Sequence, residues 1–162
     1  RSEFLTETRG EGTLHRQFDS YGPWAGDIEN RKNGALVSMV GGTASGYSLF
    51  NLQERGKLFV KPTDEVYDGM VVGEHAREND LEVNVTKGKK LTNVRAAGSD
   101  DHIVLEPALE VTLEFGLEFI VEDELLEVTP DAIRIRKRAL NTPERKRDRK
   151  VIEARAAAGR TG

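Results

Sequence analysis

The sequence contains no cysteine among its 162 residues. This absence excludes disulfide bonds, zinc-thiolate sites and cysteine nucleophiles. Long hydrophobic runs are also missing. No stretch approaches the roughly 18 consecutive apolar residues that a membrane helix needs, and the N-terminus lacks the apolar core of a signal peptide. The sequence therefore predicts a soluble, cytoplasmic protein that makes no membrane contact.

Apolar residues are scarce, at 37% hydrophobic against 32% charged. Such a balance predicts one modest core with part of the chain left solvated. The length suits one domain, or one small domain with part of a neighbour. The chain begins at Arg1 rather than at a methionine, and residues 1–8 have the pattern of a helix interior. We therefore expect a fragment of a longer protein.

The charges are strongly segregated behind a net charge of -4. Every charged residue from Asp100 to Asp131 is acidic, whereas basic residues dominate from Arg134 to Arg149. A chain of this kind can bind phosphate groups through one part while it remains acidic overall.

Local patterns predict a β-rich chain. Residues 13–21 alternate as a strand does, and Gly41 and Gly42 predict a hairpin turn. Further strands are expected at 35–40, 44–52, 58–60, 70–72, 125–128 and 132–138. Short strands with glycine turns favour an α+β fold built on a small curled sheet or a barrel-like domain.

Helices are expected at two further places. Thr112 can cap a short amphipathic helix through Ile120, and Gly116 weakens that helix. Its apolar positions form one stripe of Leu113, Leu117 and Ile120 and a neighbouring stripe of Phe115 and Phe119. Thr142 followed by Pro143 suits the start of a highly charged terminal helix.

The composition changes between Gly22 and Asn33, where a proline, two glycines and mixed charges interrupt the regular patterns. We place a domain boundary there. The expected division is a remnant of a preceding domain at 1–24, a β-rich domain at 25–140 and a basic tail at 141–162, helical or disordered.

No catalytic constellation is complete. A phosphate-binding P-loop needs a lysine after its glycines, and Tyr47 stands at that position after Gly41–Gly46. The three histidines lack a nucleophile pattern, and the acidic residues lack the spacing of a calcium loop. The sequence thus predicts no catalytic residue, no metal site and no cofactor in this chain.

The stretch from Gly73 to Asp101 is polar and basic, with few apolar anchors, so we expect a long surface loop or extended hairpin. Its basic side chains can neutralise phosphates, and its amides and hydroxyls can bond 2′-hydroxyls or base edges. Ordinary solvated surface is the alternative interpretation. The candidate RNA contacts are Arg77, Asn79, Asn84, Lys87, Lys89, Lys90, Thr92, Asn93 and Arg95.

A second basic surface is expected after residue 134. Its candidate residues are Arg134, Arg136, Lys137 and Arg138. A charged terminal helix with internal ion pairs explains the same pattern equally well.

Long blocks of the chain are distinctive: NGALVS at Asn33–Ser38, LFNLQERG at Leu49–Gly56, EVYDGMVVG at Glu65–Gly73, HARENDL at His75–Leu81, KGKKLTNVRA at Lys87–Ala96 and DELLEVTP at Asp123–Pro130 leading into IRIRKR at Ile133–Arg138. They resemble the C-terminal domain of the BipA/TypA family of translational GTPases. Residues 1–21 resemble the last helix and strand of the ferredoxin-like domain V that precedes it, as in elongation factor G. Two positions depart from the family pattern: Glu74, usually aliphatic, adds negative charge beside His75, and Gly116 is commonly alanine.

The resemblance implies a ribosome-associated GTPase whose G domain, with GTP and Mg²⁺, lies upstream of this chain. It also implies that a loop of the C-terminal domain contacts 23S rRNA and the acceptor end of A-site tRNA near the peptidyl transferase region. Carried onto this sequence, the loop is His75–Ala97, which adds His75 to the candidate contacts. The family is linked to stress adaptation and large-subunit assembly.

We therefore expect a monomeric, non-catalytic RNA-binding module. The rival hypothesis is a structural domain that braces the upstream domains and binds a protein partner through its acidic surface. The acidic run from Asp100 to Asp131 is the feature that supports this rival.

Overall fold

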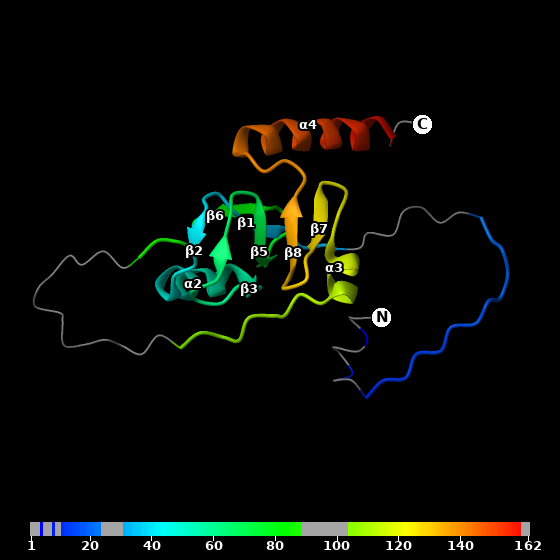
Figure 1. Cartoon of the computed structure of the whole chain (residues 1–162). Helices are drawn as coiled ribbons and strands as arrows, with labels where there is room; N and C mark the ends of the chain where they lie inside the picture. Colours follow the sequence, from blue (N-terminus) through cyan, green and yellow to red (C-terminus); the bar gives the residue numbers. More distant parts are fainter. Residues whose placement is uncertain (1–3, 5–7, 9–10, 24–30, 89–103, 160–162) are drawn as a thin grey trace, which may run out of the picture.

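A computed structural model of the chain describes residues 4, 8, 11–23, 31–88 and 104–159 (Figure 1). The strands are β1 (Ala35–Ser38), β2 (Gly42–Thr43), β3 (Gly56–Leu58), β4 (Glu65–Val66), β5 (Met70–His75), β6 (Leu81–Val83), β7 (Glu124–Val128) and β8 (Ile133–Lys137). The helices are α2 (Gly46–Leu52), the 3-10 helix η1 (Gln53–Arg55), α3 (Leu113–Phe119) and α4 (Thr142–Gly159). The prediction of a β-rich α+β fold is confirmed.

The main sheet has six strands in the order β6-β1-β5-β8-β7, with β3 paired to β5 outside this path. All pairs are antiparallel except β1 with β6. β5 is the centre: β1 lies on one edge, while β8 pairs with its first residues and β3 with its last. The described strands do not close on themselves, so the sheet is open rather than barrel-like.

Alternation along the central strands divides the core between the two faces of the sheet. On one face Leu36 and Val72 join a cluster that includes Leu49 of α2. On the other, Val37, Val71 and Ile135 of β8 pack with Phe119 of α3. Since successive side chains of a strand point to opposite faces, α2 and α3 each cover one side of the sheet.

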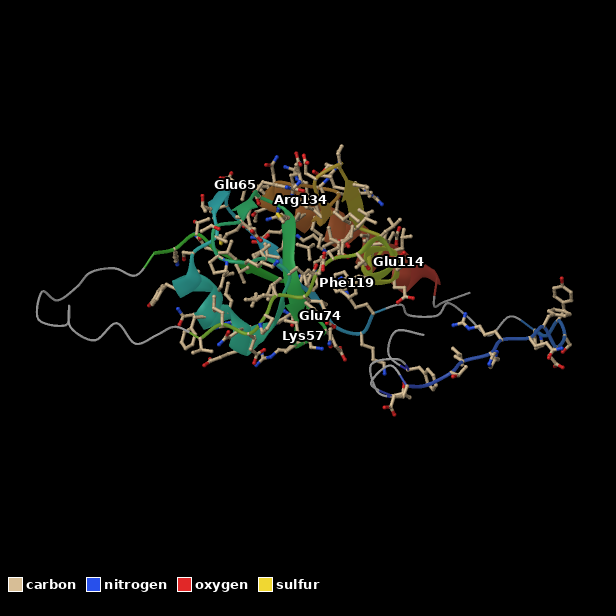
Figure 2. All side chains as sticks on the ribbon, turned by 60° about the horizontal axis from the view of Figure 1, so that its bottom comes forward. Lys57, Glu65, Glu74, Glu114, Phe119 and Arg134 are labelled. Atoms are coloured by element: carbon tan, nitrogen blue, oxygen red, sulfur yellow. The ribbon has the colours of Figure 1, made fainter. Side chains whose placement is uncertain are left out.

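Helix α3 begins after Thr112, whose hydroxyl accepts a hydrogen bond from Phe115 N at 3.2 Å, as predicted. Its buried stripe differs from the expected one. Phe119, labelled in Figure 2, is buried, and its ring packs edge-on against that of Phe59 with 5.2 Å between the ring centroids. Leu113 and Leu117 are exposed. Gly116 lies on the buried side, because a Cβ there would come within 2.5 Å of Leu126 Cδ1. This glycine therefore permits close packing of α3 on β7.

The strand expected at 44–52 is wrong, because this segment forms α2. The side chain of Ser45 accepts a hydrogen bond from Ser48 N at 3.1 Å and so satisfies a free N–H of the first helical turn. Leu49 is fully buried and Leu52 packs beside it, while Tyr47 and Phe50 remain exposed. This spacing of apolar residues is helical.

The strand expected at 13–21 is also not formed: residues 11–23 carry neither helix nor strand. A strand needs a hydrogen-bonded neighbour, and no described residue pairs with this segment. The terminal helix is confirmed as α4, which runs across one end of the sheet (Figure 1). None of the helices in the described ranges is both long and apolar enough to cross a membrane.

Candidate nucleic-acid interface

The segment predicted as a surface loop from residue 73 starts inside the sheet. β5 continues to His75, and β6 adds a parallel strand beside β1. Val83 and Val85 belong to the core, and Val85 is fully buried. The prediction of a surface loop or extended hairpin from residue 73 is therefore wrong for residues 73–75 and 81–83, which are strands of the main sheet.

The predicted contacts near the start of this segment form a tight turn. His75 is buried, and its Nδ1 lies 2.5 Å from the carbonyl oxygen of Asn79. The side chain of Asn79 donates to the carbonyl of Asp80 at 3.2 Å, and Arg77 is exposed. His75 therefore holds the turn together, and a contact of its ring with RNA would require this turn to open.

Asn84 and Lys87 lie at the other end, where the chain leaves β6. Asn84 Oδ1 accepts hydrogen bonds from the backbone N–H and the hydroxyl of Thr86, both at 2.9 Å. Lys87 is exposed, but its carbonyl oxygen accepts hydrogen bonds from the hydroxyls of Ser45 and Ser48. Lys89, Lys90, Thr92, Asn93 and Arg95 lie outside the described residues.

Helix α2 holds the chain on both sides of segment 89–103. Before the segment, Lys87 is bonded to the N-cap region of α2. After it, Glu106 N donates to the side chain of Gln53, the C-cap residue of α2, at 3.3 Å. The chain therefore contacts α2 on both sides of the segment, and the later stretch then runs on to α3 (Figure 1). The length of α2 sets the spacing of these two anchor points.

A groove of about 360 Å³ lies between α2 and β6, next to Lys87. Five of its lining side chains are the types that contact RNA: Tyr47, Asn51, Arg55, Asn84 and Lys87. We call this the α2–β6 groove. Tyrosine offers a stacking face, the amides offer hydrogen bonds and the two basic groups can neutralise phosphate.

Glu82 also lines the α2–β6 groove, but its negative charge is paired. Arg145 of α4 donates to Glu82 Oε1 through Nε at 3.2 Å and Nη2 at 3.0 Å. The same guanidinium bonds Asp68 Oδ1 at 3.0 Å, and its side chain is only 9% exposed. Arg145 therefore attaches α4 to β6.

Two members of the predicted second basic surface share one acidic neighbour. Arg134 and Arg136 lie 3.7 and 3.8 Å from the carboxylate of Glu127. Tyr67 donates its hydroxyl to the same carboxylate, and burial together with this hydrogen bond raises the tyrosine pKa. Arg138 bonds the carbonyl of Glu122. The shared carboxylate supports the interpretation of internal ion pairs for Arg134 and Arg136, whereas Arg138 is exposed.

Lys137, the remaining member of that set, is buried in a cluster of charges. Its ammonium lies 2.6 Å from Asp80, 3.0 Å from Asp123 and 3.0 Å from Glu124. Arg31 is the second cation of the cluster. Its guanidinium donates two hydrogen bonds to the carboxylate of Glu124, and the guanidinium carbon lies 4.1 Å from the centroid of the Phe119 ring. Lys137 is thus a structural residue and is not available to RNA.

The cluster shifts the ionisation of two members. Burial alone would raise the pKa of Asp80, but the Lys137 ammonium, the Ala35 N–H and Arg31 outweigh it and hold that pKa below its usual value. Burial alone would lower the pKa of Lys137, but Glu124, Asp80 and Asp123 raise it above its usual value. Both shifts favour the charged forms.

Part of the acidic run from Asp100 to Asp131, which supports the hypothesis of a protein partner, forms ion pairs within the domain. Asp123 and Glu124 belong to the buried cluster, and Glu127 pairs with β8. Glu106, Glu110 and Glu114 remain exposed. In the described part of the chain no group of three or more His, Cys, Asp or Glu could hold a metal ion.

Residues 33–142 match the family model of the TypA/BipA C-terminal domain. The chain belongs to the TypA/BipA family. It is 52% identical over 148 residues to the large ribosomal subunit assembly factor BipA of Haemophilus influenzae, 51% to that of Escherichia coli K12 and, over 147 residues, 50% to that of Bacillus subtilis. These alignments cover 90–91% of this chain but only 24% of each relative, so the chain spans about a quarter of their length.

The family resemblance seen in the sequence is confirmed, but three groove residues were missed as candidates. Tyr47, Asn51 and Arg55 were overlooked because their segment was expected to be a strand and a turn. The signal was present: Ser45 is a good cap residue, and it precedes buried positions Leu49 and Leu52 at helical spacing.

Proposed function

We propose that this TypA/BipA-family chain binds ribosomal RNA through segment 73–101, and that it is itself non-catalytic. The loop residues Lys87, Lys89, Lys90 and Arg95 neutralise phosphates, while Asn84, Thr92 and Asn93 supply polar contacts. The observation that carries the proposal is that the chain is bonded to α2 at Lys87 and, beyond the segment, at Glu106. This attachment fixes where the basic residues leave the domain.

The relatives' name, large ribosomal subunit assembly factor, supports the ribosome as the partner. In the full-length cytoplasmic protein, we propose an upstream G domain that uses GTP and Mg²⁺. The present chain would then contact 23S rRNA and the acceptor end of A-site tRNA as a monomer. Assembly of the large subunit and adaptation to stress are the proposed cellular roles.

The test is a titration of the fluorescently labelled 162-residue chain with purified large ribosomal subunits over a series of salt concentrations. A variant with alanine at Lys87, Lys89, Lys90 and Arg95 should bind more weakly. The slope of log affinity against log salt should also fall by about 3, at roughly 0.7 per lost phosphate contact.

A matched control removes four exposed positive charges elsewhere. Alanine at Arg16, Lys32, Lys57 and Lys61 should leave most of the slope intact. Equal affinity and slope for the loop variant and the unaltered chain would rule out the proposal. Binding that survives nuclease digestion of the subunits would instead favour the protein-partner hypothesis.

A further inference from the structure

The α2–β6 groove combines features that a solvated surface seldom brings together. Tyr47 is 40% exposed on the outer side of α2, so part of its ring is open to a ligand. Arg55 and Lys87 are both exposed and line the same groove. An aromatic face beside two cations is the arrangement with which proteins hold single-stranded nucleic acid.

We propose that the α2–β6 groove takes one unpaired RNA nucleotide, whose base stacks on Tyr47 while Arg55 and Lys87 hold its phosphates. This rests on the proposed function, and it adds a site on the folded domain to the contacts of the loop. The groove volume, about 360 Å³, lies within the range of small-ligand sites. Lys87 lines the groove and is also one of the candidate contacts of the loop.

The two asparagines of the groove offer complementary hydrogen bonds to a base edge. Asn51 donates its Nδ2 to the carbonyl of Tyr47 at 2.7 Å, which leaves its Oδ1 as an acceptor. Asn84 uses its Oδ1 to accept from Thr86, which leaves its NH₂ group as a donor. A base edge that carries one donor and one acceptor matches this pair.

The probe is a short single-stranded RNA that carries one 2-aminopurine, whose fluorescence falls when the base stacks on an aromatic ring. With the full chain, Tyr47→Ala should weaken binding about tenfold and abolish the quenching, because stacking on one aromatic ring contributes that order of affinity. Tyr47→Phe keeps the ring and should retain both. Phe50→Ala removes an equally exposed ring of α2 that does not line the groove, and should change neither.

Charge is tested with a second pair. Arg55→Ala should weaken binding several-fold and lower the salt slope, whereas Lys57→Ala, exposed outside the groove, should leave both unchanged. Melting curves establish that each variant is folded.

The outcomes separate this site from the loop proposal. If the loop variant loses RNA binding but Tyr47→Ala does not, the groove proposal is overturned and the proposed function stands. If neither variant affects RNA binding, both are overturned. If Tyr47→Ala leaves RNA binding intact but weakens the capture of nuclease-treated ribosomal protein, the groove is a protein contact and the proposal is likewise overturned.

Discussion

The hydroxyl of Ser48 donates a hydrogen bond of 2.9 Å to the carbonyl oxygen of Lys87, 39 residues further along the chain. Ser48 is buried in α2, so this bond fixes the backbone of an exposed lysine to the core of the domain. It places α2 directly beside Lys87, one of the candidate RNA-binding residues.

Ser48→Ala tests whether this anchor matters for binding. Removal of this hydroxyl should cost about 0.5–1.5 kcal/mol of stability, because one of the two hydrogen bonds to the Lys87 carbonyl is lost while that from Ser45 remains. Since Lys87 is then less well held, affinity for single-stranded RNA should also fall several-fold. Both quantities can be measured on one preparation, by urea unfolding and by RNA titration.

Ser38→Ala is the matched control. Ser38 is fully buried and its hydroxyl bonds the carbonyl of Val40 at 2.8 Å, away from the groove. The Ser38→Ala variant should lose a similar amount of stability, and its affinity for RNA should not change. An equal loss of affinity in both variants would show that general destabilisation, and not the anchor, governs binding.

Lys137 should be among the most sensitive positions in the chain. Its side chain is 4% exposed and faces three carboxylates, so Lys137→Met leaves Asp80, Asp123 and Glu124 with Arg31 as their nearby cation. Loss of one partner of a buried ion pair costs about 3–5 kcal/mol. Lys57→Met, on an exposed strand position seen in Figure 2, should stay within about 0.5 kcal/mol of the unaltered chain in urea unfolding.

The same cluster predicts how stability responds to acid. The pKa of Asp80 is lower in the folded chain than its ordinary value of 3.8. The ionised carboxylate therefore stabilises the fold above that pH, and this stabilisation is lost as the pH falls through the pKa of the folded state. Asp80→Asn should therefore be less stable than the unaltered chain at neutral pH. The difference should shrink as the pH drops below about 4.

Melting temperatures measured from neutral pH into the acid range check this. Asp131→Asn, which removes an exposed carboxylate, should keep the acid dependence of the unaltered chain. A constant gap between Asp80→Asn and the unaltered chain across the whole range would contradict the prediction.

The strands with clear local signals were predictable from the sequence. Residues 70–72 and 133–137 alternate or run apolar between turn residues, and both became strands of the main sheet. The Thr112 cap likewise located α3. The residues of each of these elements show its periodicity or its cap, so the element can be predicted without knowing which distant residues it contacts.

Other features depend on contacts between residues far apart in sequence. Lys137 looked like surface charge because nothing local shows that Asp80, 57 positions earlier, and Arg31 lie beside it. Which stripe of α3 is buried was decided by Phe59 and Leu126, which pack against Phe115 and Phe119. The α2–β6 groove was hidden for the same reason, since it forms only when α2 packs beside β6.

Gly69 links β4 and β5 in a conformation that other residues rarely adopt. Its φ is +85°, and a Cβ would lie 2.8 Å from Leu140 Cα, a backbone atom that cannot easily move. Gly69→Ala should therefore cost about 2 kcal/mol or more. Gly88→Ala meets nothing within 4 Å, and should change the unfolding free energy by less than about 0.5 kcal/mol. Equal effects of the two substitutions would contradict this account of Gly69.

Arg145 should decide whether α4 stays folded on the domain. The helix is rich in charge and polar on all sides, and an isolated helix of 18 residues is marginal in water. Arg145 bonds Glu82, Asp68 and Thr142, so Arg145→Ala removes its best-connected link to the sheet. We expect lower helical circular dichroism and faster amide exchange in 142–159, with β5 and β8 still protected. Arg147→Ala, exposed on the same helix, should change neither signal, and unchanged exchange in both variants would show that α4 is held by other contacts.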